Sequence, residues 1–435
     1  YYKKIYRLAD SMNWTDTKEQ EEFRIAVQNF IKDRLPDYYV KKSKDPAGTD
    51  LQPDENGVQY SHDWQHDMAL GSDEAKKGAK EWAEALAENG WSAPHWPKEY
   101  GGGGLSSMEQ FIFKQELALN GAPLVGGSGV AMLGPTLIHH GTEEQKKEFL
   151  PKTLNGDILW AQGYSEPGAG SDLASLQTRA VKDGDNYVVN GQKIWTSQGH
   201  KATWFFMLVR TDPEAPKHRG ITFVLADTRE NGVEVRPLIS GGWQHATNES
   251  FYTDVKIPVS RRVGEENRGW YVAMNLLDFE RSNVEGAVSM RRGIEKLLVY
   301  TAGEEGREKS RLTSGGTLRA EVADRYIETE VMFQFSARII SIQAAGMVPN
   351  YEASTAKLYN SELLQRLSAT SIKTFGLYGT LWGQGTEDGP TSLYAAQAGA
   401  PSYNYLRSVP ATIRGGTSEV QRNIIATRGL GLPRG

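Results

Sequence analysis

The stretch Gly163-Tyr-Ser-Glu-Pro-Gly-Ala-Gly-Ser-Asp172 stands where the hydrophobic pattern of the chain changes from helical to alternating. A glycine-rich turn ahead of a β region exposes backbone N–H groups that can approach a ligand closely. Ser165 and Ser171, on either side of the turn, add hydroxyls that can complete the hydrogen bonding. Taken alone, the stretch is more simply a tight turn that binds nothing, so its meaning depends on the sequence around it.

The region from about residue 156 to 268 alternates between apolar and polar residues, which is typical of strands. Its first hairpin is predicted within Tyr187–Trp195, where Asn190-Gly191 suits a type I′ turn. Further strand-like runs follow, separated by turn residues: Trp204–Val209, Ile221–Leu225, Val233–Val235 and Phe251–Ile257. Several short strands at this spacing predict a small β-barrel or sandwich.

Both flanks of this region have helical periodicity. Thr17 and Gln20 have the spacing of a capping box, and a second amphipathic helix is predicted over Ser72–Asn89. Thr317–Gly346 is a long run without proline, which favours a helical bundle. The chain is therefore predicted to be an α+β multidomain protein, with an N-terminal helical domain at 1–155, a central β-barrel domain at 156–268 and a C-terminal four-helix bundle at 269–435.

The composition is that of an ordinary enzyme, and 435 residues can form two or three domains. A formal net charge of −5 predicts no nucleic-acid surface, and no run approaches the ~18–20 apolar residues of a transmembrane helix. The absence of Cys excludes disulfides and thiolate ligands, and the 8 His have no metal-ligand spacing, so no metal is expected. These observations predict a cytoplasmic protein with no membrane and no nucleic-acid partner.

A second stretch near the end of the chain, Arg414-Gly-Gly-Thr-Ser-Glu-Val-Gln-Arg422, gives the central one its meaning. Together with Asn190–Trp195, Trp96–Gly102 and Phe251–Pro258, the two stretches resemble the flavin-holding signatures of the acyl-CoA dehydrogenases. The resemblance covers nearly the whole chain, from about residue 15 to 432, in one order. It implies an α-domain, a β-barrel and a four-helix bundle, which is also the fold that the periodicity predicts.

The resemblance implies FAD as the cofactor and an acyl-CoA as the substrate. The flavin contacts that it implies are the backbone amide of Tyr164, the hydroxyl of Ser165, the indole of Trp195 and the hydroxyl of Ser197. Two more residues, Thr417 and Glu419, match positions near the adenosine end of FAD. The substrate contacts implied are Ser171, at the position that meets the CoA chain, and Arg281.

The identity of the catalytic base depends on Gly415, which stands where many family members have a glutamate. Removing a proton from Cα requires a carboxylate in a water-poor site and donors on the thioester oxygen. The isovaleryl and long-chain enzymes take the base from the first long helix of the C-terminal domain, and Leu277-Asp-Phe-Glu-Arg281 matches that position. The resemblance thus implies Glu280 as the base, with the Gly415 N–H and a flavin ribityl hydroxyl as donors. Asp278 and Glu285 fall on other parts of the helix, and Glu280 paired only with Arg281 is the structural alternative.

Many family members complete each FAD site with Arg-x-x-Phe-Gly and Gln-x-x-Gly-Gly segments from a second subunit. This chain has Lys309–Gly316 and Lys373–Leu377 at those places, and only Arg311 and Gly376 match. The helix-borne glutamate, the Arg-Gly-Gly-Thr loop and the Gly-Leu-Gly-Leu-Pro-Arg ending of this chain resemble those of bacterial relatives that act on steroid side-chain thioesters. Those relatives pair with a second, different subunit. The resemblance implies an electron-transfer flavoprotein as the electron acceptor, with oxygen as the alternative acceptor. It implies that the chain assembles either into a homo-oligomer (dimer or tetramer) or into a heterotetramer with a second acyl-CoA dehydrogenase-like subunit.

The function implied is FAD-dependent α,β-dehydrogenation of an acyl-CoA to the trans-2-enoyl-CoA. Glu280 would abstract the Cα proton while flavin N5 accepts the Cβ hydride. Two alternatives stay open: a flavin monooxygenase of the same fold that needs no base, and a non-catalytic partner subunit of a heteromeric dehydrogenase.

Overall fold

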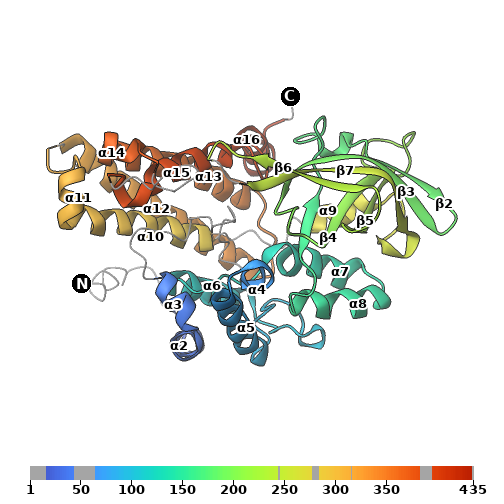
Figure 1. Cartoon of the computed structure of the whole chain (residues 1–435), viewed down its shortest axis with the longest axis horizontal. Coiled ribbons are helices and arrows are strands. Elements are labelled where there is room, and N and C mark those ends of the chain that lie inside the picture. Colours follow the sequence, from blue (N-terminus) through green and yellow to red (C-terminus); the bar gives the residue numbers. More distant parts are fainter. Residues whose placement is uncertain are drawn as a thin grey trace.

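The computed structural model describes residues 16–43, 64–242, 245–276, 284–314, 316–382 and 394–433. Within these ranges the chain forms helices, then a β-sheet, then helices again (Figure 1). In Figure 1 the N-terminal helices lie below, the sheet lies at the upper right and the long C-terminal helices lie at the upper left. The fold class predicted from the periodicity is therefore confirmed.

The N-terminal helices begin where side chains satisfy the first free backbone N–H groups. Thr17 and Gln20 form the predicted capping box of α2 (Lys18–Arg34), and Ser72 caps α5 (Asp73–Glu88). The other helices of this part are α3 (Asp37–Ser43), α4 (Trp64–Leu70), α6 (Ser107–Asn120), α7 (Gly134–His140) and α8 (Glu143–Leu154). The apolar faces of α2 to α6 meet in a core that includes Val27, Ile31, Trp82, Leu86 and Phe113, whereas those of α7 and α8 join the core of the sheet.

The central sheet has the strand order β6-β7-β3-β2-β4-β5-β8, and β1 pairs with β4. Its strands are β1 (Trp160–Gly163), β2 (Arg179–Asp183), β3 (Asn186–Ser197), β4 (Trp204–Arg210), β5 (Ile221–Asp227), β6 (Val233–Ile239), β7 (His245–Pro258) and β8 (Arg262–Val263). β4 and β5 are buried along nearly their whole length, which explains why their sequences are continuous apolar runs. β1 runs parallel to β4, and the glycine-rich loop begins where β1 ends.

The predicted hairpin turn at Asn190-Gly191 is wrong. β3 continues through both residues, with a bulge in its pairing with β7. The turn between β2 and β3 lies instead at Gly184-Asp185. Gly191 is required for a different reason, because a β-carbon there would lie 2.7 Å from the Cα of Thr178 on the neighbouring backbone. The Asn-Gly pair thus marks a close approach of two strands.

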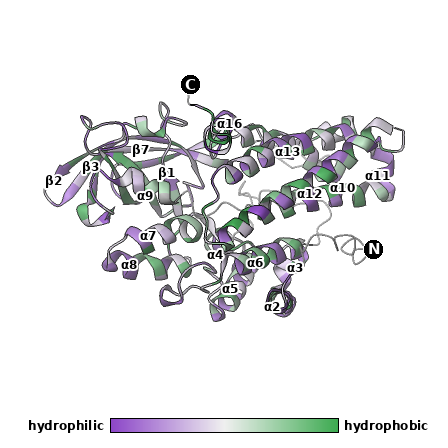
Figure 2. Cartoon of the chain, turned by 180° about the vertical axis from the view of Figure 1, so that it is seen from behind, coloured by the Kyte–Doolittle hydropathy of each residue, from purple (hydrophilic) through white to green (hydrophobic). Residues whose placement is uncertain are grey.

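The C-terminal part is dominated by three long helices: α10 (Val284–Ala302), α12 (Gly316–Ala344) and α13 (Tyr351–Phe375). The long helix predicted over residues 317–346 is therefore confirmed. Figure 2 shows hydrophobic and hydrophilic residues alternating along these helices, and their buried side chains meet at Met290, Met332 and Leu363. The shorter helices are α9 (Gly269–Leu276), α11 (Glu304–Lys309), α14 (Leu377–Thr380), α15 (Ala400–Ser408) and α16 (Ser418–Ile424).

The three parts share buried contacts. Phe111 on α6 belongs to one buried cluster with Val284 on α10 and Ile340 on α12. Phe149 on α8 packs edge-on against Trp160 of β1 and Trp204 of β4. The N-terminal helices therefore contact both the sheet and the bundle, and the junction of the three parts is where the candidate site lies.

Candidate active site

The glycine-rich loop leaves β1 after Gly163 and closes on itself. The backbones of Glu166 and Ala169 hydrogen-bond to each other at 2.9 and 3.0 Å. A β-carbon at Gly168 or Gly170 would meet no atom within 4 Å. The backbone between these residues is therefore open to a ligand, as a loop that binds through N–H groups requires.

A buried ion pair fixes this loop to β3. The ammonium of Lys193, which is 0% exposed, lies 2.7 Å from the carboxylate of Glu166 and donates to the Tyr164 carbonyl at 3.2 Å. The same carboxylate accepts the N–H groups of Gln177 and Thr178 at 2.6 and 2.8 Å. Burial acts to raise the pKa of Glu166, but Lys193 and these donors hold it below its usual value. The sequence analysis missed this pair, although both residues lie inside the two motifs that it used.

The two residues ahead of Glu166 face opposite ways. The ring of Tyr164 is buried against Phe206 and Phe223, with ring centroids 6.1 and 6.4 Å away, so only its backbone can serve a ligand. Ser165 is partly exposed, and its carbonyl accepts the N–H of Ile194 at 2.9 Å. This bond holds Ser165 beside the end of β3. Ser171, at the other end of the loop, is exposed.

Trp195 is the most unusual residue at the end of β3. Its φ of 61° lies in the left-handed region, which a bulky residue rarely adopts. Its side chain is 63% exposed, although the two flanking positions are more buried. Strain of about 1–3 kcal/mol of this kind persists only where the surrounding structure enforces it, and it is common at ligand sites. An exposed, strained indole beside Ser165 is better explained by a planar ligand that stacks on it than by contact with solvent alone.

Two polar atoms next to Trp195 are buried without a partner. Among the described residues, neither Thr196 Oγ1 nor Gln198 Oε1 makes a hydrogen bond. Buried polar atoms are nearly always paired, so such atoms in a native structure call for a ligand or a water. Ser197 lies between them and is exposed. Thr196 and Gln198 were not predicted as site residues. The sequence offered one clue to them, namely that they lie within three residues of Trp195.

A histidine pair lies beside this strand end. The rings of His200 and His245 stack with centroids 3.7 Å apart, and the side chain of Asn248 lies within hydrogen-bonding distance of both, at 3.2 and 2.6 Å. Burial lowers the pKa of His200 to about 4, and the charges of His245 and Lys201 act in the same direction. His200 is therefore neutral near pH 7.

The closing loop between α15 and α16 turns at two consecutive glycines in the left-handed region, Gly415 with φ 64° and Gly416 with φ 90°. The ammonium of Lys357 on α13 donates to the carbonyl of Gly416, which ties the loop to the bundle. A β-carbon at Gly415 would meet nothing within 4 Å, so open space lies on its side-chain face. No acceptor among the described residues takes the Gly415 N–H, which is therefore available to a ligand.

Thr417 and Glu419 follow this turn. The Oγ1 of Thr417 accepts the N–H of Val420 at 3.2 Å and caps α16, a structural role that the sequence analysis did not assign to it. Glu419 lies exposed in the first turn of the same helix. Both residues therefore lie at the N-terminus of α16, where a negative charge such as that of Glu419 is favourable.

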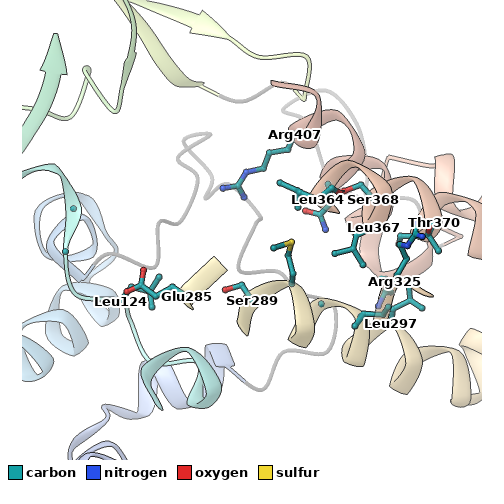
Figure 3. Close-up of a pocket in the computed structure, with 18 of the residues that line it drawn as sticks. Leu124, Glu285, Ser289, Leu297, Arg325, Leu364, Leu367, Ser368, Thr370 and Arg407 are labelled. Carbon is teal, nitrogen blue, oxygen red and sulfur yellow. The ribbon is translucent and has the colours of Figure 1, made fainter. Parts of the chain in front are cut away.

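A cavity of about 760 Å³ opens at the junction of the three parts (Figure 3). It is large enough for a ligand of drug size, since such sites span roughly 300–1,000 Å³. Gln198 from the end of β3 lines it, and so do residues of the segment 124–132 and of α10, α12, α13 and α15. The cavity thus begins at the end of β3 and extends into the helical bundle.

Glu280 and Arg281 lie outside the described residues. The first turn of α10, just after them in sequence, contributes Glu285 to the cavity wall. The carboxylate of Glu285 is 3.6 Å from the ammonium of Lys114 on α6, in an ion pair that is largely buried on both sides.

The two residues that remain of the cross-subunit motifs are neighbours. The N–H of Arg311 donates to the carbonyl of Thr374 at 2.8 Å, and a β-carbon at Gly376 would lie 3.1 Å from the Arg311 side chain. No metal-binding group of three or more His, Cys, Asp or Glu side chains occurs in the described part of the chain. Within the same part, no helix is both long and apolar enough to cross a membrane.

Comparison with known proteins gives three domain matches in sequence order. The N-terminal, middle and C-terminal domains of acyl-CoA dehydrogenases match residues 65–157, 161–255 and 267–430. Acyl-CoA dehydrogenase FadE26 of Mycobacterium tuberculosis is 37% identical over 356 residues, which are 80% of this chain and 86% of that protein. Acyl-CoA dehydrogenase IpdE1 of the same organism is 35% identical over 369 residues, covering 83% and 90%.

Two solved structures have the same fold over almost the whole chain. The Tcur3481-Tcur3483 steroid ACAD has a TM-score of 0.77 at 30% identity, covering 98% of this chain and 100% of that one. The ChsE4-ChsE5 complex from Mycobacterium tuberculosis has a TM-score of 0.75 at 32% identity, with the same coverage. The chain therefore belongs to the acyl-CoA dehydrogenase family of flavin-dependent oxidoreductases, which act on acyl-CoA substrates.

Proposed function

We propose that the chain oxidises an acyl-CoA to the trans-2-enoyl-CoA with FAD as cofactor, Glu280 as base and the Gly415 N–H as a donor to the thioester oxygen. One observation carries the proposal. Within four residues, the end of β3 presents the exposed Trp195, the Thr196 hydroxyl, which has no partner among the described residues, and Gln198, which lines the cavity. A planar cofactor at that strand end would lie beside the space for a substrate.

The residues present fit FAD. Ser165, the backbone at Tyr164, Trp195 and Ser197 would hold the ring system, and Thr417 and Glu419 would lie near the adenosine end. The buried Oγ1 of Thr196 gains a partner if a polar ring edge approaches it. When bound, FAD supplies the acceptor for the hydride that leaves Cβ. The exposed loop backbone at Gly168 and Gly170 supports the same placement.

The base is assigned to Glu280 because the closing loop has no carboxylate at Gly415 and the sequence at 277–281 matches the helix-borne position. Its role would be to take the Cα proton in a site from which the substrate excludes water, where a carboxylate becomes more basic. Glu285 lines the described part of the cavity, but its ion pair with Lys114 engages its charge. We therefore treat Glu285 as a comparison residue.

The Gly415 N–H would donate to the thioester oxygen, where negative charge develops as the proton leaves. Oxyanion donors of this kind contribute about 2.7–4 kcal/mol in other enzymes. The free N–H supports this role, and Lys357 holds the next peptide in place. A glycine suits the position because its φ of 64° costs other residues about 1–2 kcal/mol.

The test is anaerobic reduction of the bound flavin by a panel of acyl-CoAs, measured as the loss of flavin absorbance. We expect Glu280→Gln to slow reduction by at least about 100-fold, because general-base catalysis contributes roughly 10²–10⁴. Glu285→Gln, the matched control on α10, should slow it far less. Full activity in Glu280→Gln would refute the base. Hydroxylated product formed in air would favour the monooxygenase, and failure to bind FAD even with a second subunit would favour a non-catalytic chain.

We further propose that a second, different acyl-CoA dehydrogenase-like subunit completes the FAD site, and that the acyl group is bulky. One solved relative is the ChsE4-ChsE5 complex, which has two components, and the other is the Tcur3481-Tcur3483 steroid ACAD. The poor match of the cross-subunit motifs in this chain supports the same assembly. Measuring FAD content in the chain alone and co-expressed with candidate subunits tests it. Full FAD occupancy in a homo-oligomer would refute it.

A further inference from the structure

The end of β3 holds two strained residues close together. Trp195 has a φ of 61° and Gln198 a φ of 56°, both in the left-handed region that side chains rarely adopt. Trp195 falls at a bulge, because the pairing of β3 with β7 shifts its register between Lys193 and Thr196. We call residues 195–198 the β3-end segment. Strained backbone persists only where the surrounding structure enforces it, so the contacts of this segment show what enforces it.

A buried side chain on β7 holds the middle of the segment. Asn248, which is 0% exposed, donates from Nδ2 to the Thr196 carbonyl at 3.0 Å. That carbonyl lies between the two left-handed residues in the chain. The N–H of Gln198 donates to the carbonyl of Ala246, also on β7, at 3.0 Å. Gly199 leaves room for the amide, since a β-carbon there would lie 3.2 Å from Nδ2 of Asn248.

Two histidines bind the same amide and have fixed roles in doing so. A carbonyl only accepts hydrogen bonds, so the amide must turn Nδ2 toward Thr196 and Oδ1 the other way. Oδ1 lies 2.6 Å from Nε2 of His245, which must therefore carry a proton. Nδ2 also lies 3.2 Å from Nδ1 of His200, which must therefore accept. His200 can accept only as a neutral ring with its proton on Nε2.

The surroundings keep His200 in this neutral form. Burial lowers its pKa to about 4, and the charges of His245, Lys201 and His66 act in the same direction. His245 stacks on the ring from β7, with the ring planes inclined by 21°. Lys201 follows β3 in the chain, and His66 lies on α4. The ionisable groups that act on His200 from these three elements are thus all bases.

We propose that Asn248, His200 and His245 form a positioning network that holds the β3-end segment in the conformation that binds the flavin, with His200 as a neutral acceptor and His245 as a donor to the same amide. The inference rests on the proposed function, since it takes the segment as part of the FAD site. The network reaches the ligand space because Trp195 is exposed and Gln198 lines the cavity.

The alternative hydrogen-bond arrangement shows why the roles matter. A proton on Nδ1 of His200 would put two donors face to face at the Asn248 amide. The amide would have to turn over to relieve this, and Oδ1 would then point at the Thr196 carbonyl. The bond that holds the segment would be lost, and a buried carbonyl would face another acceptor.

The first test measures FAD affinity at about pH 7 by titrating the apoprotein of the full chain, with its second subunit if one is required. Asn248→Asp keeps the shape of the side chain but cannot donate to the Thr196 carbonyl. We expect its Kd for FAD to rise about tenfold. The matched control is Asn231→Asp, the same change at an exposed position between β5 and β6, which should alter the Kd by less than about twofold.

Two variants of His200 test its role as an acceptor. Gln presents an oxygen that can accept from Nδ2, whereas Met has nearly the same length and no strong acceptor. The Kd for FAD should stay within about twofold of the wild-type value in His200→Gln and rise about fivefold in His200→Met. A ring that only filled space would give the two variants the same Kd. If Asn248→Asp fails to fold, this pair decides.

A spectroscopic measurement tests the hydrogen-bond roles without any flavin. Nitrogen NMR spectra are recorded at about pH 7 on protein with isotope-labelled histidine. The ring signals that disappear in His200→Gln should be those of a neutral ring with Nε2 protonated and Nδ1 bare. A proton on Nδ1 of His200 would overturn the network.

A double-mutant cycle tests whether the amide acts through the segment. Asn248→Asp should raise the Kd for FAD by less than about threefold in a Trp195→Ala background, against about tenfold in the wild type. Equal effects in the two backgrounds would overturn the positioning role.

Failure of the network and failure of the proposed function give different results. Tight FAD binding by the wild type, unchanged in Asn248→Asp and in His200→Met, would overturn the network and leave the proposed function standing. A wild type that binds no FAD, alone or with its second subunit, would refute the proposed function and with it the flavin role of the network.

Discussion

The buried ion pair between Lys193 and Glu166 should be the most sensitive point of the glycine-rich loop. Lys193→Met keeps the length and most of the volume of the side chain but leaves the Glu166 carboxylate buried without its cation. Removing one partner of a buried pair costs about 3–5 kcal/mol. The N–H groups of Gln177 and Thr178 remain on the carboxylate, so we expect a loss near the lower limit, about 3 kcal/mol.

The loss is measured from urea unfolding, as the shift in midpoint at constant slope. Lys182→Met, the same change at an exposed position on the neighbouring strand β2, is the control and should cost less than about 0.5 kcal/mol. Lys193 also donates to the Tyr164 carbonyl, which lies in the glycine-rich loop that we propose to hold the flavin. FAD affinity should therefore fall by about tenfold or more in Lys193→Met, a change of about 1.4 kcal/mol.

The double variant Glu166→Gln with Lys193→Met tests the physical reason. Because it removes both charges, it should be more stable than Lys193→Met alone. A loss of less than about 1 kcal/mol in Lys193→Met, typical of surface pairs, would refute the reasoning. Additive losses in the double variant would also contradict it, since they would mean that the two side chains act independently.

Trp195→Ala should weaken FAD binding by about tenfold, because aromatic contacts contribute about 0.5–1.5 kcal/mol beyond the area that they bury. Trp195→Phe should retain part of the FAD affinity, and fluorescence titration with FAD measures the affinity of both variants. Gly415→Ala should fold with a stability loss of about 1–2 kcal/mol from its φ of 64°, and unchanged FAD content would show that the loop needs its backbone, not a side chain. His200 has a pKa of about 4 when folded, against about 6.5 when unfolded, so the unfolded state binds more protons between these values and stability falls on acidification through that window. Because His200 is only partly shielded from solvent, which screens its charge, we expect a loss on the order of 1 kcal/mol when urea midpoints are compared at about pH 7 and about pH 4.5, and no such loss in His200→Gln.

Local sequence signals predicted the helices well. The capping box at Thr17 and the cap at Ser72 open helices where they were expected, because a cap acts on backbone groups only two or three residues away. Burial along β4 and β5 likewise follows from apolar runs in the sequence. The error at Asn190-Gly191 has a long-range cause. Pairing of β3 with β7 and the close approach of Thr178 override a turn signal that is strong only over a few residues.

The sequence by itself determined the order of helices and strands, the two glycine-rich loops and the family, since these depend on periodicity and on residues adjacent in the chain. Only the tertiary structure brought Lys193 to Glu166, 27 residues apart, and placed Arg325 and Ser371, from two different helices, in the lining of one cavity. Spacing does not encode such meetings, because they depend on strand register and helix packing. The glycine-rich loop that the sequence marks as a ligand site is thus held in place by a contact that the sequence does not reveal.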